Sequence, residues 1–208
     1  MSLTTPRLLY FDLGNVLLNF DHEIACRNLA ALLATTPERI RSIVFESDWQ
    51  SRYEHGIVST EALADELNRQ TGSTAPLAEL RRASAEIFEL NLPVVPIVGQ
   101  LRAAGHRLGI LSNTCDAHWQ YVFPRYRILR DWFDVFALSY EIRSMKPEPQ
   151  IYAAAARLAG CAPGELFFVD DRADNVAGAR TAGLDAVHFT SARQLASDLR
   201  ERGLLFNY

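Results

Sequence analysis

The sequence is poor in cysteine, in long apolar runs and in clustered positive charge, and each shortage argues against a class of protein. Three scattered cysteines among 208 residues predict reduced thiols in a cytoplasmic protein rather than a disulfide framework. No apolar stretch approaches the roughly 20 residues that span a bilayer, so we expect no membrane partner. A net charge of −4 without a local Lys/Arg cluster gives no electrostatic footprint for nucleic acid, and we expect no nucleic-acid partner.

The sequence does contain enough apolar residues for one buried core and a small second unit, since 49% of the chain is hydrophobic and 22% is charged. Short apolar runs that end in small or polar residues predict buried strands, and helical patterns separate the later ones. We therefore predict an α/β fold with a doubly wound parallel sheet. The predicted strands are Arg7–Leu13, His106–Ser112, Val135–Tyr140, Glu165–Asp170 and Asp185–Thr190, and the helices between and after them are Val94–Ala104, Asp116–Arg130, Gln150–Ala159, Asn175–Ala182 and Ala192–Glu201.

One segment, residues 21–90, interrupts the alternation because it shows helical signals and no convincing strand. We predict a small helical cap, residues 17–91, inserted directly after the first strand of an α/β core formed by residues 1–16 and 92–208. The signals for helix starts in this segment are a plausible N-cap, a proline at a first turn and a sequence that resembles a capping box. They are found at Asp21, at Thr36-Pro37 and at Ser59.

Polar side chains follow three of the predicted strands at the point where each strand ends. Because the carboxyl ends of parallel strands gather at one edge of a sheet, we expect these side chains to share a ligand site. They are Asp12 at the end of the first strand, Ser112 and Asn113 at the end of the second, and Asp170 and Asp171 at the end of the fourth, with Lys146 between the last two groups in sequence.

This collection suits phosphoryl chemistry. Carboxylate oxygens bind Mg²⁺, and a lysine with hydroxyl and amide donors can neutralise and hold the oxygens of a phosphoryl group. Each part also has a plainer interpretation, since Asp12 or Ser112-Asn113 could simply begin a turn and Lys146 could be an exposed lysine. The pair Asp170-Asp171 favours a metal, because adjacent acids that close an apolar run repel each other unless a cation is present.

Four segments in this order resemble the motifs of the haloacid dehalogenase (HAD) superfamily, and the resemblance covers nearly the whole chain. It implies a Rossmann-like core with a small mobile helical cap, and a hydrolase that acts on a small phosphorylated metabolite with Mg²⁺. The segments are Phe11-Asp12-Leu13-Gly14-Asn15-Val16, Leu111-Ser112-Asn113, Lys146-Pro147-Glu148-Pro149-Gln150-Ile151-Tyr152 and Phe168-Val169-Asp170-Asp171, and Gly178-Ala179-Arg180-Thr181-Ala182-Gly183 matches the continuation after the fourth motif.

The resemblance also implies a role for each matching residue. The nucleophile would form an aspartyl-phosphate, two residues would hold the phosphoryl oxygens with an amide nearby, and acidic groups with one backbone carbonyl would coordinate Mg²⁺. The nucleophile would be Asp12. Ser112 and Lys146 would hold the phosphoryl oxygens, with Asn113 close by. The Mg²⁺ ligands would be Asp12, the carbonyl of Gly14 and Asp171, with Asp170 as a direct or water-mediated ligand.

The chain departs from the family pattern at Gly14, where many phosphatases of the superfamily carry a second aspartate that protonates the leaving alcohol. Loss of a general acid costs on the order of 10²–10⁴ in rate. One explanation is a substrate that needs little acid assistance, such as a hexose 1-phosphate, and the Gly14-Asn15-Val16 variant resembles that of bacterial phosphatases acting on α-glucose 1-phosphate. Another is a group supplied when the cap closes. The candidates for that group are His22 and the segment Trp49 to Gly56, within which we predict substrate contacts from Tyr53, Glu54 and His55.

Two alternatives remain open at this point. A 2-haloacid dehalogenase of the superfamily would also lack the second aspartate, but such enzymes usually show Ser and Asn in place of the pair Asp170-Asp171. A catalytically weak binding or regulatory member would have no use for the nucleophile Asp12. The oligomeric state cannot be predicted from this sequence.

Overall fold

The structure, a computed structural model, describes residues 5–204 and is built on a parallel sheet with the strand order β5-β4-β1-β6-β7. Every neighbouring pair in this sheet is parallel, as the alternation of strands and helices predicts. β1 lies at the centre, so its carboxyl end faces the switch in strand order between β4 and β6. The strands are β1 (Leu8–Phe11), β4 (Leu108–Ser112), β5 (Val135–Leu138), β6 (Leu166–Asp170) and β7 (Asp185–His188).

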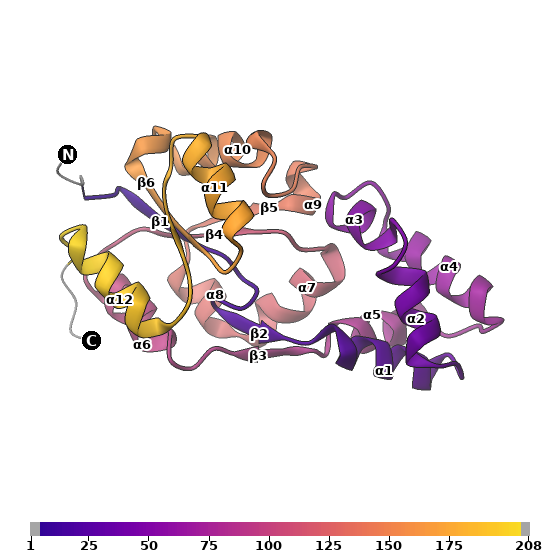
Figure 1. Ribbon diagram of the computed structural model, residues 1–208. Coiled ribbons are helices and arrows are strands. Elements are labelled where there is room, and N and C mark those ends of the chain that lie inside the picture. The colour runs from indigo at the N-terminus through magenta and orange to yellow at the C-terminus, as the bar shows by residue number, and fades with distance from the viewer. Residues whose placement is uncertain (1–4, 205–208) are drawn as a thin grey trace.

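Helices cover both faces of the sheet, and the alternation of side chains along β1 shows why. Leu9 and Phe11 belong to the apolar cluster under one helical layer, and Leu8 and Tyr10 belong to the cluster under the other. All four are fully buried. Figure 1 shows α10 and α11 on one face and α6, α8 and α12 on the opposite face. The helices of this part are α6 (Val95–Ala103), α7 (Asp116–Arg125), α8 (Arg127–Trp132), α9 (Ser139–Ile142), α10 (Pro149–Ala159), α11 (Ala173–Thr181) and α12 (Ala192–Glu201), with a 3-10 turn η1 (Pro163–Glu165).

The inserted segment forms five helices that lie together at the end of the molecule beyond the carboxyl edge of β1 (Figure 1). Three of the predicted helix starts are confirmed, because Asp21, Thr36 and Ser59 each accept a hydrogen bond from a backbone N–H in the first turn. These helices have an apolar cluster of their own. They are α1 (His22–Leu32), α2 (Pro37–Val44), α3 (Trp49–Glu54), α4 (Thr60–Thr71) and α5 (Leu77–Ala85).

The prediction that this segment contains no strand is wrong. β2 (Leu18–Phe20) pairs antiparallel with β3 (Phe88–Leu90) in a two-stranded ribbon where the chain enters and leaves the helical segment. Three residues per strand are too few to display a period of two, and the helical pattern of α5 runs into β3 without a break in composition. Leu18 packs into the apolar cluster of the main sheet, which ties the ribbon to the core.

Several other boundaries shift by one or two residues, and at two places the predicted element itself changes. The helix predicted over Asp116–Arg130 is interrupted at Tyr126, whose backbone is extended. Pro124 lacks an N–H for the helix ladder, and the Tyr126 hydroxyl donates to the carbonyl of Phe88 in the ribbon. The strand predicted over Val135–Tyr140 ends at Leu138, because Ser139 begins the short helix α9.

No helix among the described residues is both long enough and apolar enough to cross a membrane. The proposed division into core (1–16 and 92–208) and cap (17–91) stays a prediction, and its outermost residues, 1–4 and 205–208, lie outside the described residues.

Candidate active site

The carboxyl ends of β1 and β6 bring three acidic residues together. Asp12 directly follows β1, Asp170 is the last residue of β6, and Asp171 comes next. Each of the three offers a carboxylate oxygen, and these oxygens all lie within 4.8 Å of one another. The predicted grouping of these acids at one edge of the sheet is therefore what the structure shows.

Lys146 lies between two of these acids. Its Nζ is 2.9 Å from Asp12 Oδ1 and 2.6 Å from Asp170 Oδ2, and it donates to the carbonyl of Leu111 at 3.0 Å. The side chain is 1% exposed. It is also the only lysine among the 208 residues, against 20 arginines, so composition itself singles it out. A compact ammonium in this position partly offsets the charge of two buried carboxylates.

Asn113 positions Lys146 through the backbone. The side chain of Asn113 donates to the carbonyl of Lys146 at 2.9 Å and accepts from the N–H of Lys146 at 2.8 Å. These two bonds link the end of β4 to the loop before α10. Asn113 also lines the cavity described below, so the structure adds a positioning contact to its predicted place beside the substrate.

The remaining acids differ in how fully they are satisfied. Asp170 is fully buried and accepts from Lys146, from the N–H of Arg172 and from Asn175 Nδ2. The half-buried Asp171 accepts from Asn15 Nδ2 at 3.0 Å. Three carboxylates facing one lysine leave an excess of negative charge. The atoms that they offer to a metal are all oxygens, so the set suits a hard cation such as Mg²⁺.

Burial and the neighbouring charges together shift the pKa of Asp12, a residue that is 7% exposed. Burial raises the pKa of Asp12 to about 7; Lys146 lowers it, and Asp170 and Asp171 raise it. Asp12 Oδ1 accepts from the N–H of Leu13 at 2.7 Å as well as from Lys146, which fixes the plane of the carboxylate. No described residue donates to Oδ2, so this oxygen is available to a ligand.

A cavity of about 400 Å³ opens onto these groups, and it is bounded by both the sheet domain and the helical segment. Glu54, at the end of α3, is the one residue of the predicted trio of cap contacts that lines it. Ser112 lies in a smaller adjoining hollow that shares Gly14 and Glu54 with this cavity. The lining residues are Asp12, Gly14, Asn15, Phe20, His22, Gln50, Glu54, Asn113, Met145, Lys146, Asp171, Arg172 and Asn175.

The other two predicted cap contacts point elsewhere. The Tyr53 hydroxyl lies 2.6 Å from Thr60 Oγ1 and accepts from the N–H of Ala117, inside the packing between cap and core. His55 Nε2 lies 2.7 Å from Glu148 Oε1, so it links the cap to the loop after Lys146. The structure thus places Tyr53 and His55 at the cap–core junction, outside the cavity.

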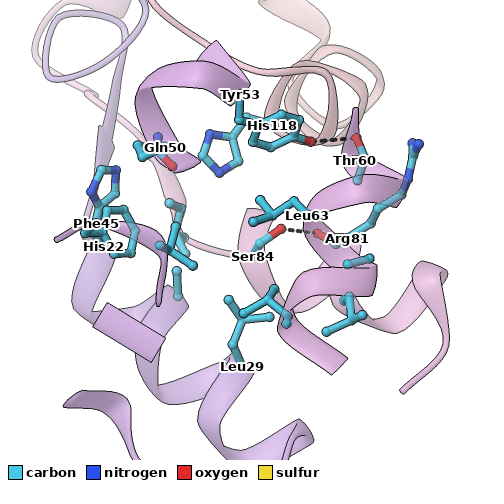
Figure 2. A pocket seen from close by; sticks show the side chains of 16 residues that line it. His22, Leu29, Phe45, Gln50, Tyr53, Thr60, Leu63, Arg81, Ser84 and His118 are labelled. Atoms are coloured by element: carbon cyan, nitrogen blue, oxygen red, sulfur yellow. Dashed lines mark hydrogen bonds between the residues drawn. The ribbon is translucent and has the colours of Figure 1, made fainter. Parts of the chain in front are cut away.

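A second, smaller hollow, shown in Figure 2, is lined by residues of the helical segment and by His118 of α7. Its walls are mainly aliphatic, and His22 and Gln50 line both this hollow and the cavity of Asp12. His22 lies between the rings of Phe20 and Phe45, with centroid separations of 4.9 and 4.6 Å. Figure 2 shows His22 beside Phe45 on one wall, with Gln50 and His118 nearby.

Sequence reasoning did not single out Asn15, Phe20 or Gln50. Asn15 has a φ of +55°, a conformation in which asparagine is enriched, so an Asn directly after Gly14 is the signal that could have marked it. Gln50 donates to Glu54 across one helical turn, a spacing that is visible in the sequence. Phe20 reaches the site through the ribbon, for which no sequence signal exists.

The chain is similar in sequence to known hydrolases and phosphatases. A family model for haloacid dehalogenase-like hydrolases matches residues 6–183. A phosphatase of Mycobacterium tuberculosis is 28% identical over 187 residues, which are 85% of this chain and 83% of that protein. The D-ribitol-5-phosphate phosphatase of Bacteroides thetaiotaomicron is 27% identical over 173 residues, which are 80% of this chain and 83% of that protein.

A crystal structure of a HAD-family enzyme from Bacteroides thetaiotaomicron, in complex with magnesium and inorganic phosphate, is similar with a TM-score of 0.79 and 26% identity. The match covers 89% of this chain and 95% of that one. Family model, relatives and fold agree with the resemblance seen in the four motifs, and the predictions of an α/β fold and of a hydrolase are confirmed. The chain belongs to the haloacid dehalogenase-like hydrolases.

Proposed function

We propose that this hydrolase is a Mg²⁺-dependent phosphatase of a small sugar phosphate, with a hexose 1-phosphate as the first candidate, and that it works through an aspartyl-phosphate on Asp12. The observation that carries the proposal is the placement of Asp12, Lys146 and Asp171 around one cavity. The D-ribitol-5-phosphate phosphatase among the relatives supports a sugar or sugar-alcohol phosphate as substrate class.

The residues of this chain divide the work as follows. Leu13 and Lys146 hold Asp12 Oδ1, which leaves Oδ2 to attack phosphorus in line with the departing oxygen. Lys146 is placed to neutralise a phosphoryl oxygen once the phosphate enters, and Ser112 and Asn113 are proposed to hold the others. Water then attacks the phosphorus of the acyl phosphate and restores the carboxylate.

Asp12, Asp171 and the carbonyl of Gly14 would hold Mg²⁺, with Asp170 as a direct or water-mediated ligand, and the ion would reduce the repulsion between the phosphate and the attacking carboxylate. The pair Asp170-Asp171 is the reason to prefer this function over dehalogenation. Carboxylate oxygens of the three acids lie within 4.8 Å of one another, so the side chains repel each other, and a bound cation would relieve that repulsion.

The substrate proposal predicts release of inorganic phosphate from sugar phosphates in the presence of Mg²⁺. Glucose 1-phosphate, glucose 6-phosphate and ribitol 5-phosphate should be compared at equal concentration, with nucleotides and acyl phosphates as the contrasting classes. We expect the sugar phosphates to have the highest kcat/KM. A preference for nucleotides or acyl phosphates over every sugar phosphate would contradict the proposed substrate class.

Removal of the metal should abolish phosphate release. We expect EDTA to reduce turnover to background and Mg²⁺ to restore it, while Ca²⁺, which takes more ligands at longer distances, should restore it poorly. The same samples should be assayed with 2-chloropropionate for chloride release. Chloride release that survives EDTA would favour the dehalogenase alternative instead.

A further inference from the structure

The space above Gly14 is filled by an aromatic ring. A Cβ built on Gly14 would lie 2.6 Å from the Phe20 ring, which packs in turn against the rings of His22 and Phe88. An acidic side chain at this position would have to displace that ring. The usual place for a general acid is therefore filled by the Phe20 ring in this protein, so for a leaving oxygen that needs protonation the donor would come from another element.

His22, which lines the cavity, and His118, which lines the hollow adjoining it, are poor donors. Burial lowers the pKa of His22, and its ring is held between two phenylalanine rings. Burial lowers the pKa of His118 to about 4. Both imidazoles are therefore neutral near pH 7, and neither carries the extra proton that an imidazolium donor needs.

Glu54 is held over the cavity by contacts between cap and core. The Ser139 hydroxyl donates to the Glu54 carbonyl at 2.6 Å, and the neighbouring His55 contacts Glu148. Gly56 lies so close to Tyr140 that a Cβ would come within 2.1 Å of the Tyr140 carbonyl oxygen. The end of α3 thus lies against the core, and Glu54 lines the same cavity as the nucleophile.

The protonation of Glu54 suits a donor. Burial raises the pKa of Glu54 above the ordinary value of a glutamate; the hydrogen bond from Gln50 and the charges of Lys146, His55 and Arg172 lower it without cancelling the shift. Asp12 and Asp171 line the same cavity as Glu54.

We propose that Glu54 of the cap is the general acid and base that replaces the missing aspartate, an inference that rests on the proposed phosphatase function. As Asp12 Oδ2 forms its bond to phosphorus, the bond from phosphorus to the ester oxygen breaks, and that oxygen takes the proton of the Glu54 carboxyl to leave as an alcohol. The Glu54 carboxylate then takes a proton from the attacking water while the bond from phosphorus to Asp12 breaks, which yields phosphate and restores both residues.

The test is the dependence of a Glu54→Gln variant on the leaving group. For a sugar phosphate whose leaving oxygen is an ordinary alkoxide, such as glucose 6-phosphate or ribitol 5-phosphate, kcat/KM should fall by about 10²–10⁴-fold, because the alkoxide must leave unprotonated and kcat/KM reports only the steps up to release of the alcohol. For 4-nitrophenyl phosphate, whose phenolate needs little assistance, the fall should be less than about tenfold. Glu79→Gln, at an exposed position in the first turn of α5, is the matched control and should change neither rate.

The pH profile supplies a readout that a purely structural role would not move. A donor must be protonated, so wild-type kcat/KM for the sugar phosphate should fall as the pH rises through the pKa of Glu54, and the variant should lack this limb. Equal losses for both esters, or no loss for either, would overturn the role of Glu54 while leaving the phosphatase intact. A wild-type enzyme that releases phosphate from neither ester would overturn the proposed function and this inference with it.

Discussion

Asp12→Asn should reduce phosphate release by on the order of 10⁴-fold or more, because an amide oxygen cannot form the acyl phosphate on which both half-reactions depend. The fold should tolerate the change. Lys146 keeps its contact with Asp170 at 2.6 Å, so no buried charge is left without a partner, and the cost of burying the Asp12 carboxylate disappears. The free energy of unfolding should therefore stay within about 1 kcal/mol of the wild-type value.

Steady-state phosphate release and urea unfolding would measure the two effects. Asp131→Asn, at an exposed acid of α8, is the control for loss of one negative charge. Mass spectrometry of acid-quenched turnover mixtures should also find a phosphoryl group on Asp12 of the wild type and none on the variant. Residual turnover of more than a few per cent of the wild-type rate would rule out the covalent route.

Lys146→Met should damage both folding and activity. Without the ammonium, Asp12 and Asp170 would be buried with no cation, and loss of one partner from such a group typically costs about 3–5 kcal/mol. We expect that loss in the free energy of unfolding at pH 8 in EDTA. Mg²⁺ should recover part of it, because a bound dication compensates the same carboxylates.

The pH dependence of this loss has a definite sign. The pKa of Asp12 in the folded protein is already raised to about 7 by burial, and removal of Lys146 raises it further. A raised carboxyl pKa stabilises the fold at low pH and loses that contribution as pH rises through the folded value, so the deficit should be smaller at pH 5 than at pH 8.

Arg172→Met provides the comparison for this experiment. Arg172 lines the same cavity, but its side chain is 65% exposed and pairs with Asp174, so its loss should cost no more than about 1 kcal/mol. Urea unfolding of both variants at pH 5 and pH 8 would measure how much free energy of unfolding each substitution costs. A Lys146→Met protein as stable at pH 8 as the Arg172→Met protein would contradict the proposed charge balance.

The sequence predicted best those structural features that depend on one short segment or on a repeated pattern of apolar residues. The segments that form β1 and β6 are apolar up to their last residues because helices cover both faces of the sheet. The ends of these strands, and with them the positions of Asp12 and Asp170, could therefore be predicted from the sequence. The N-caps Asp21, Thr36 and Ser59 are equally local, since each bonds within its own first turn.

What could not be predicted depends on contacts between distant segments. The ring of Phe20 covers Gly14 because β2 pairs with β3, about 70 positions further along the chain. Tyr53 and Glu54 are neighbours in sequence and were predicted to act together, yet α3 turns one toward Thr60 in the packed interior and the other toward Asp12. A helix separates adjacent side chains by about 100°, so its rotation against the core decides which of the two reaches the cavity.

The burial of the chain's single lysine has a practical use. Growth with lysine labelled at the side-chain nitrogen would give one ammonium resonance, and that nucleus lies within 3 Å of both Asp12 and Asp170. The spectrum would need no assignment. Titration with magnesium, phosphate or a sugar ester would then report occupancy directly, in a probe that leaves every atom of the catalytic centre unchanged.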